Sequence, residues 1–306
     1  MRFIRQDVVS EAEAREVGPF DVAFYGQDDL DDRSRHSAAL SRAAAQRSFQ
    51  VRYDPANCTL TVGGDKVMRV DCLEDLFRDF RAQSILLDAT TLEFPELLYV
   101  LSAYRMQIQR PRCGFFYVEP EGYKQRDPSA SIVPGNVFDL SSGFRSKSLL
   151  PRFSRMLSDS NRAHLVAFLG FEGDRLMRVL DDDDGHFYQQ VSIVFGIPPF
   201  QPSWDLHALM ANSSLLERQN TAVMYCGANN PRAAYKLLQD AHAGIAGGRT
   251  NRLLVAPFGT KPMALGAALY CIDNEILSPI YDHPVRKPNR TYGIHRRHWY
   301  EIDMSR

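Results

Sequence analysis

The sequence predicts an α/β protein with a doubly wound, mostly parallel sheet. Short apolar runs alternate along nearly the whole chain with longer helical segments, which is the pattern of strands joined by crossover helices. Polar turns that contain glycine or proline follow most of the short runs. The clearest example is an apolar run at 253–256, a turn with Pro257 and Gly259, and an apolar helical stretch at 263–272.

The first half of the chain, residues 1–145, reads as one α/β unit. Its predicted strands are 20–26, 84–87 and 112–118, and its predicted helices are 37–47, 73–80 and 94–106. Residues 51–70 form two alternating segments around Gly63-Gly64, which is a hairpin signal, and we interpret them as an insertion at the sheet edge. Residues 121–153 are rich in Ser, Pro and Gly and predict a long loop or a linker.

The second half, residues 146–306, carries the same alternation and reads as a Rossmann-like unit. Its predicted strands are 163–170, 191–197, 222–226, 253–256, 278–281 and 292–302, and its predicted helices are 206–218, 232–243 and 263–272. V-A-F-Y-G and V-A-F-L-G open the two halves, and each leads into an acidic loop with Asp-Arg. This similarity indicates two related halves, although they can also form one continuous domain.

Composition narrows the class of protein. The 306 residues have a formal net charge of −1, so no global basic field favours bulk nucleic-acid binding. No apolar run reaches the roughly 20 residues that span a membrane, and the N-terminus lacks the apolar core of a signal peptide. The 5 cysteines are scattered without a C-x-x-C pair, which argues against structural zinc and a disulfide framework. We therefore expect a cytoplasmic protein.

The polar turns all fall where predicted strands end, and ligands of parallel α/β sheets bind beyond the carboxyl ends of strands. These turns supply the candidate ligand-binding residues Arg33, Asp88, Thr90, Thr91, Arg175, Asn229, Asn230, Gly259, Thr260 and Lys261. Asp or Thr before a helix can instead cap its free N–H groups, and this alternative applies at residues 88–91. Asn230, before Pro231, is also expected to be a helix cap.

The Gly259-Thr260-Lys261 turn has the chemistry of a phosphate site. A helix N-terminus presents free N–H groups and the positive end of the helix dipole, and a hydroxyl and an ammonium add donors. The chain has no full P-loop signature and no G-x-G-x-x-G. A solvated lysine on an ordinary strand–helix joint remains the alternative.

The strand that runs into G-T-K-P-M and an apolar helix resembles the corresponding joint of CARF domains, the Rossmann-like sensors of CRISPR-associated systems. The resemblance covers Gly259 to Met263 and the elements on either side. It implies binding of a nucleotide or cyclic oligonucleotide through Thr260 and Lys261, usually in a dimer, within an antiviral defence system. No nuclease domain is evident, so an effector would be a separate protein of the same system, in a homodimer or hetero-oligomer.

Two other functions fit the same pattern. One is metal-assisted hydrolysis of a nucleotide or phosphodiester with Mg²⁺ or Mn²⁺, for which the candidate catalytic carboxylates are Asp31, Asp32, Glu172 and Asp174. The other is a non-catalytic subunit whose scaffold binds a protein partner. His295 and His298 would face opposite sides of a strand, so a shared metal there is not expected.

Overall fold

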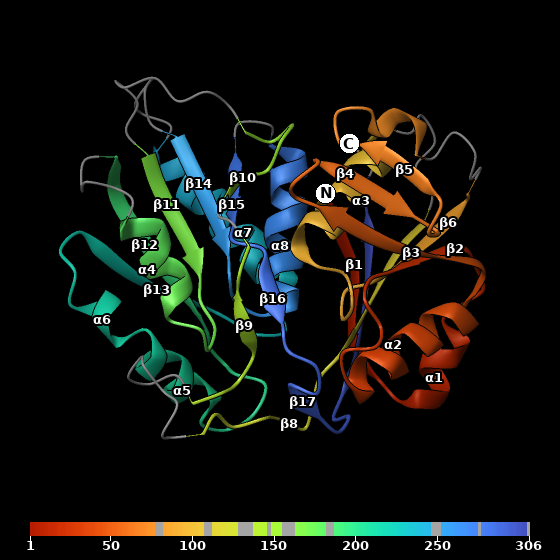
Figure 1. Cartoon of the computed structure of the whole chain (residues 1–306), viewed down its shortest axis with the longest axis horizontal. Coiled ribbons are helices and arrows are strands. Elements are labelled where there is room, and N and C mark those ends of the chain that lie inside the picture. The colour runs from red at the N-terminus through yellow and green to blue at the C-terminus, as the bar shows by residue number, and fades with distance from the viewer. Residues whose placement is uncertain are drawn as a thin grey trace. The chain divides into compact units, whose positions relative to one another are not determined.

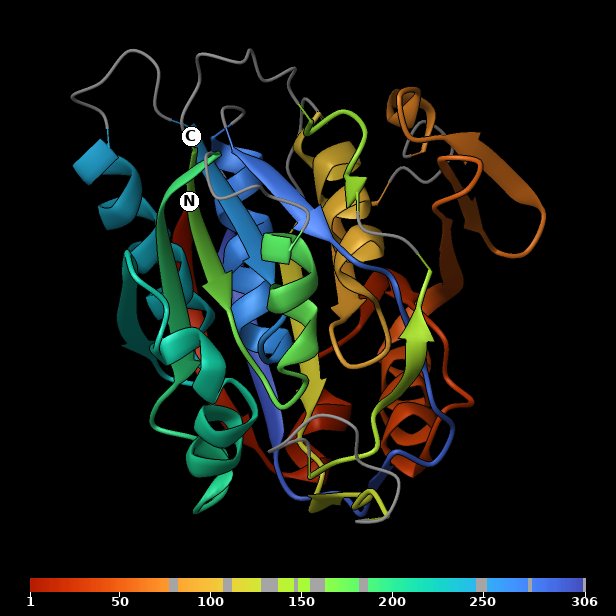
Figure 2. The same cartoon turned by 60° about the vertical axis from the view of Figure 1, so that its left-hand side comes forward.

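A computed structural model describes residues 1–76, 82–106, 112–127, 137–145, 148–154, 163–181, 187–245, 252–274 and 277–304 (Figures 1 and 2). The chain divides into two compact units. The first contains Met1–Tyr123 and Arg286–Arg306, and the second contains Lys124–Val285. The C-terminal segment therefore returns to the first unit, and the boundary lies before the predicted position at residues 145–146.

The first unit is built on an 8-stranded sheet with the order β1-β18-β7-β6-β2-β3-β4-β5. The strands are β1 (Arg2–Val9), β2 (Phe20–Tyr25), β3 (Ala45–Asp54), β4 (Thr59–Val62), β5 (Lys66–Arg69), β6 (Ser84–Asp88), β7 (Arg112–Val118) and β18 (Arg297–Asp303). The four central strands β7, β6, β2 and β3 are parallel, and the pairs at both edges are antiparallel. The hairpin expected near residues 51–70 is β4 and β5, shown in orange in Figure 1 at the sheet edge.

The helices of the first unit are α1 (Glu11–Glu16), α2 (Asp32–Ala43), α3 (Phe94–Arg105) and the 3₁₀ turn η1 (Leu73–Asp75). A small two-stranded sheet joins β8 (Gly122–Tyr123) to β17 (Thr291–Tyr292). The predicted helix at 37–47 begins earlier and ends at Ala43, because residues from Ala45 onward pair with β2. Of the predicted helix at 73–80, residues 77–80 lie outside the described residues.

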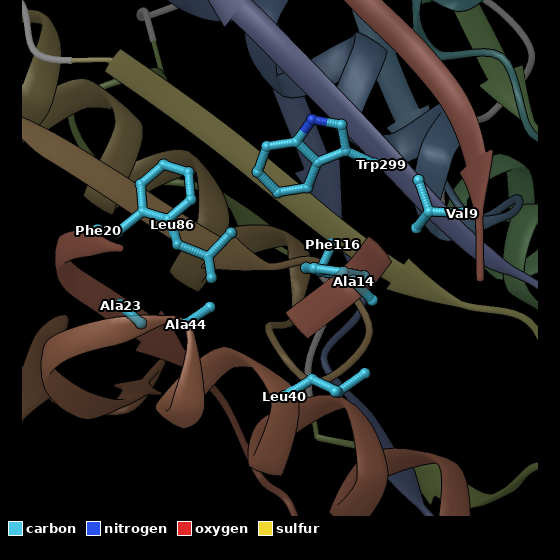
Figure 3. Close-up of a cluster of buried hydrophobic side chains, with 9 residues drawn as sticks. All are labelled: Val9, Ala14, Phe20, Ala23, Leu40, Ala44, Leu86, Phe116 and Trp299. Carbon is cyan, nitrogen blue, oxygen red and sulfur yellow. The ribbon is translucent and has the colours of Figure 1, made fainter. Parts of the chain in front are cut away.

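A core of large and small apolar side chains holds α1 and α2 against this sheet (Figure 3). Trp299 on β18 is fully buried, and its ring centroid lies 5.4 Å from that of Phe116 and 5.8 Å from that of Phe20. Gly114 makes room for the indole, since a Cβ at this position would lie 2.2 Å from a Trp299 ring carbon. Leu40 contributes the α2 side of the cluster.

The second unit is built on a 6-stranded sheet with the order β10-β15-β14-β11-β12-β13. The strands are β10 (Ser148–Leu149), β11 (Ala163–Phe168), β12 (Tyr188–Gly196), β13 (Thr221–Cys226), β14 (Arg252–Pro257) and β15 (Ser278–Tyr281). All pairs are parallel except β10 with β15. A separate two-stranded sheet joins β9 (Ser141–Phe144) to β16 (Pro284–Arg286).

The helices of the second unit are α4 (Asp174–Asp181), α5 (Trp204–Ala211), α6 (Ser213–Leu216), α7 (Pro231–Ile245) and α8 (Lys261–Asp273). In Figure 2 the green helix α4 lies in front of the sheet of this unit. Helices α7 and α8 pack closely at Gly266, where a Cβ would lie 2.3 Å from the Pro231 carbonyl oxygen. Helix α8 is buried from Pro262 to Ile272, which explains why its sequence is apolar on most faces.

The predicted alternation of strands and helices is confirmed as mixed α/β structure. The expectation of a mostly parallel sheet holds for the second unit, and in the first unit for its four central strands. The predicted strand at 292–302 is largely β18, but it is antiparallel and belongs to the first unit, because it pairs with β7 and β1. Among the described residues, no helix combines the length and the hydropathy needed to cross a bilayer.

Candidate functional site

The turn between β14 and α8 has the predicted order of strand, glycine turn and helix start. Thr260 is the N-cap of α8: its hydroxyl accepts a hydrogen bond from the Met263 N–H at 3.4 Å and donates one to the Ala228 carbonyl. Lys261 occupies the first helical position and is half-buried. Gly259 fits tightly, since a Cβ there would lie 3.2 Å from Phe168. The Thr260 hydroxyl thus fixes the turn, and Lys261 carries its positive charge.

A second turn meets the first where the strand order of the second unit reverses. If the parallel strands β11 to β15 are numbered 1 to 5 along the chain, their order in the sheet is 5-4-1-2-3. The connections that follow β11 and β14 therefore run in opposite directions across the sheet. Gly170 follows β11, and a Cβ on it would lie 3.2 Å from the Phe258 carbonyl oxygen and 3.8 Å from the Gly259 Cα. The β11–α4 and β14–α8 turns therefore approach each other through bare backbone.

Arg175 is held by a partner that the sequence did not reveal. Its Nε and Nη2 donate to the Asp282 carboxylate at 2.8 and 2.5 Å, and both side chains are buried. The guanidinium carbon also lies 4.4 Å from the centroid of the Phe258 ring. Asp282 directly follows β15, so the rule that carboxyl ends of parallel strands share one edge was the signal that could have found it.

Two predicted carboxylates accompany Arg175 at this edge. Glu172 lies 3.8 Å from the Arg175 guanidinium, and Asp174 lies 3.6 Å from that of Arg178. Burial raises the pKa of the Asp174 carboxyl, and the negative charge of Glu172 raises it further, while Arg178 opposes the shift. The surroundings of Asp174 therefore disfavour its charged form.

The β13–α7 turn supplies the last predicted residues of the second unit. The Asn230 side chain accepts a hydrogen bond from the Ala233 N–H at 2.9 Å, so its predicted capping role is confirmed. Asn229 is half-buried in the same turn. Since Thr260 donates to the Ala228 carbonyl, the β13–α7 turn is hydrogen-bonded directly to the Gly259-Thr260-Lys261 turn (the GTK turn).

In the first unit, residues 88–91 form a closed hydrogen-bond network. The Asp88 carboxylate accepts from the Ser37 hydroxyl at 2.6 Å, the Thr90 N–H at 2.9 Å and the Thr91 hydroxyl at 2.8 Å. Thr90 Oγ1 accepts from the Val118 N–H, which ties the ends of β6 and β7 together. Burial raises the pKa of the Asp88 carboxyl, and the hydrogen bonds from Ser37 and Thr91 oppose the shift.

The alternative that residues 88–91 cap the next helix is wrong, because α3 begins at Phe94 and its N-cap is Glu93. Thr91 instead accepts a hydrogen bond from the Gly26 N–H at 2.9 Å. A Cβ on Gly26 would lie 2.3 Å from the Thr91 carbonyl oxygen, so the ends of β2 and β6 are packed against each other. Ligand contact by Asp88, Thr90 and Thr91 stays a prediction.

The three candidate residues of the acidic loop in the first unit have different surroundings. Asp31 is buried and caps α2, where its carboxylate accepts from the Ser34 N–H at 2.8 Å and from the Thr291 hydroxyl. Asp32 pairs with Arg35 at the exposed surface. Arg33 is buried, with 3% of its surface exposed. The predicted carboxylates of this loop lie in the first unit, whereas Glu172 and Asp174 lie in the second.

Glu119, at the end of β7, is a buried polar residue that the sequence analysis did not single out. Its carboxylate contacts His295 Nδ1 and His298 Nε2, each at 3.0 Å. The prediction that the two histidines face apart is wrong, because β18 begins at Arg297 and His295 precedes it. Across the described part of the chain, no group of three or more His, Cys, Asp or Glu residues has an arrangement that could hold a metal ion.

Comparison with known protein families and with curated proteins finds no match to this chain.

Proposed function

We propose that this protein binds a nucleotide at the carboxyl edge of the sheet in the second unit. The observation that carries the proposal is the meeting of Gly170 and Gly259 where the strand order reverses. The 3-2-1-4-5 order, read from the β13 side, is that of doubly wound sheets that bind nucleotides at this position. In doubly wound sheets, glycine turns at this position bring the backbone close to a bound phosphate.

The residues around this point have complementary roles in the proposal. Lys261, at the start of α8, would place its ammonium on a phosphate, in addition to the free N–H groups of the first helical turn. Thr260 positions that turn through its bonds to Met263 and Ala228. Asn229, half-buried in the adjoining turn, would contact the sugar or base. Arg175 donates a hydrogen bond to the Phe258 carbonyl of the same turn, and its pair with Asp282 holds the guanidinium in place.

The resemblance to CARF domains extends the proposal to the class of ligand and the biological setting. It favours a cyclic oligonucleotide as ligand and a role as a sensor or effector component of prokaryotic antiviral defence, acting in a homodimer or with a separate protein partner. The fold and the GTK turn are compatible with this role. The chemistry of the site requires only a phosphate group next to a sugar and a base.

The test is a thermal-shift and calorimetric screen with mono- and dinucleotides and cyclic oligoadenylates. A ligand at a hundred times its dissociation constant should stabilise the protein by about 2.7 kcal/mol. Lys261→Ala should abolish the shift, whereas Lys236→Ala should retain it, because Lys236 is exposed and contacts Gln239 and Asp240 of its own helix α7. Equal binding by wild type and Lys261→Ala, or no binding of any nucleotide by folded protein, would refute the proposal.

The same screen with Mg²⁺ or Mn²⁺ separates binding from hydrolysis. Metal-dependent turnover that is lost in Glu172→Gln or Asp174→Asn would favour the enzyme, since these two carboxylates share the edge with Lys261. Binding without turnover would favour the sensor. A protein that is folded and binds no nucleotide would point to the assembly subunit.

A further inference from the structure

In the described part of the first unit, two arginines are buried: Arg33 is 3% exposed and Arg290 is 7% exposed. Each has a buried Nε atom without a hydrogen-bond partner in the described part of the chain. A buried donor that is left unpaired loses its hydration without replacement, and a buried charge costs still more. Two such groups in one unit therefore need a physical explanation.

Several contacts bring the two arginines to the same place. The Thr291 hydroxyl, next to Arg290, donates to the Asp31 carboxylate at the start of α2. The Asn289 N–H donates to the Leu30 carbonyl at 2.6 Å. The pairing of Thr291 with Tyr123 in the β8–β17 ladder fixes the segment on its other side. The loop that carries Arg290 is thus bound to the loop that carries Arg33.

The carboxylates of this region direct their hydrogen bonds to other partners, although the charges of Asp31 and Arg33 act on each other. Asp31 accepts from the Ser34 backbone and hydroxyl as well as from Thr291. Glu119 accepts from both His295 and His298. In the described residues, neither Arg33 nor Arg290 forms an ion pair within 4.0 Å of a carboxylate. Arg33 donates a long hydrogen bond, 3.4 Å, to the Val118 carbonyl, and its guanidinium also interacts with the Tyr117 side chain.

Arg290 lies among charges of both signs. Burial lowers the pKa of its guanidinium to about 10, the positive charges of Arg286 and Arg33 act in the same direction, and the carboxylates of Glu93 and Asp31 oppose the shift. Arg290 nevertheless remains charged at neutral pH. Tyr117 lies with its ring centroid 5.9 Å from the Arg33 guanidinium carbon. Burial also raises the pKa of the Tyr117 and Tyr123 phenols, so both remain protonated and can donate hydrogen bonds.

We propose that Arg33 and Arg290 bind a phosphate group at the carboxyl edge of the sheet in the first unit. Two planar guanidinium groups can contact several oxygens of one phosphate through paired N–H donors, and the anion would compensate the buried charge. The site lies beyond the ends of β2 and β7, where ligands of parallel sheets bind. It is independent of the nucleotide site proposed for the second unit.

The experiment uses the full chain with Lys261→Ala, so that phosphate binding at the second unit does not contribute. Inorganic phosphate is titrated by calorimetry at constant ionic strength, and AMP and ADP then show whether the phosphate belongs to a nucleotide. We expect saturable binding to one site, at least tenfold weaker binding in Arg290→Met, and partial recovery in Arg290→Lys. The matched control is Arg52→Gln, an exposed arginine on β3 of the same unit.

A second measurement follows the arginines directly in the Lys261→Ala protein. With ¹⁵N-labelled arginine, the Nε–H signals of Arg33 and Arg290 should shift on phosphate addition, and that of Arg52 should not. Arg33→Lys and Arg290→Lys assign the two signals. The proposal would be overturned if neither inorganic phosphate nor either nucleotide bound saturably, or if Arg290→Met bound phosphate with unchanged affinity. If Arg290→Met fails to fold, the Nε–H signals of the Lys261→Ala protein decide the question, and signals that do not shift on phosphate addition would overturn the proposal.

Discussion

The buried ion pair between Arg175 and Asp282 yields a stability prediction that can be worked through in numbers. Its side chains are only 4% and 3% exposed. Asp282→Ala leaves the guanidinium buried without its carboxylate, and removing one partner of a buried pair costs about 3–5 kcal/mol. Glu172, 3.8 Å away, and the Phe258 carbonyl, 3.4 Å away, remain as weak compensation. We therefore expect a loss near the lower end, about 3 kcal/mol.

The assay must report on the second unit alone, because a protein of two units need not unfold in one step. The chain has 2 tryptophans, of which Trp204 lies on α5 and Trp299 on β18. In a Trp299→Phe background, the fluorescence of Trp204 therefore follows the second unit. For a domain of this size, each kcal/mol shifts the midpoint by roughly 2–4 °C, so Asp282→Ala should lower it by roughly 6–12 °C.

Two further variants make the comparison decisive. Asp240→Ala breaks the exposed pair with Lys236, whose side chains are 63% and 62% exposed, and should cost less than about 1 kcal/mol. Replacing Arg175 by Met together with Asp282 by Leu should recover most of the lost stability, because no buried charge remains. If Asp282→Ala lowers the midpoint no more than Asp240→Ala does, the reasoning about the buried pair is refuted.

Gly266→Ala should destabilise the second unit by about 1–3 kcal/mol, because its Cβ would lie 2.3 Å from the Pro231 carbonyl oxygen. Gly244→Ala, on α7 with no atom within 4 Å of its Cβ, should stabilise it by up to about 1 kcal/mol. Thermal unfolding followed by Trp204 measures both, and similar shifts would contradict the packing argument. Burial would raise the pKa of Asp31, but Arg33 and hydrogen bonds lower it below 3.8. Its stabilising contribution is present above about pH 4 and is lost as the pH falls through the lowered pKa. The stability difference between wild type and Asp31→Asn, from urea unfolding of the first unit, should therefore shrink on acidification, and a constant difference would contradict this assignment.

The parts of the fold that depend on local sequence could be predicted. The β14 strand, the Gly259 turn and α8 follow one another within one apolar segment, and Asn230 caps the helix that starts at the next residue. Strand β1 was not predicted because its residues are mostly exposed and show no regular apolar alternation. The boundaries of α2 were misplaced because its alanine-rich end continues into β3 without a glycine or proline.

The candidate site depends on contacts between distant residues, which a single sequence does not show. Arg175 meets Asp282 across 107 positions, and Glu119 meets His298 across 179. Arg33 was recognised as a candidate from its own loop. Arg290 was not recognised, because nothing near it in the sequence indicates that its loop lies against Leu30.

The position of β18 has a consequence for how the protein folds during synthesis. The second unit ends at Val285, so its whole sequence is synthesised before the last strand of the first unit. Strand β18 lies between β1 and β7 and carries Trp299, so until it is made β1 has no partner and the core of Figure 3 lacks its largest side chain. Because domains generally fold as units during translation, we expect the second unit to fold first. Until β18 is added, β7 is an unpaired edge of the sheet in the first unit.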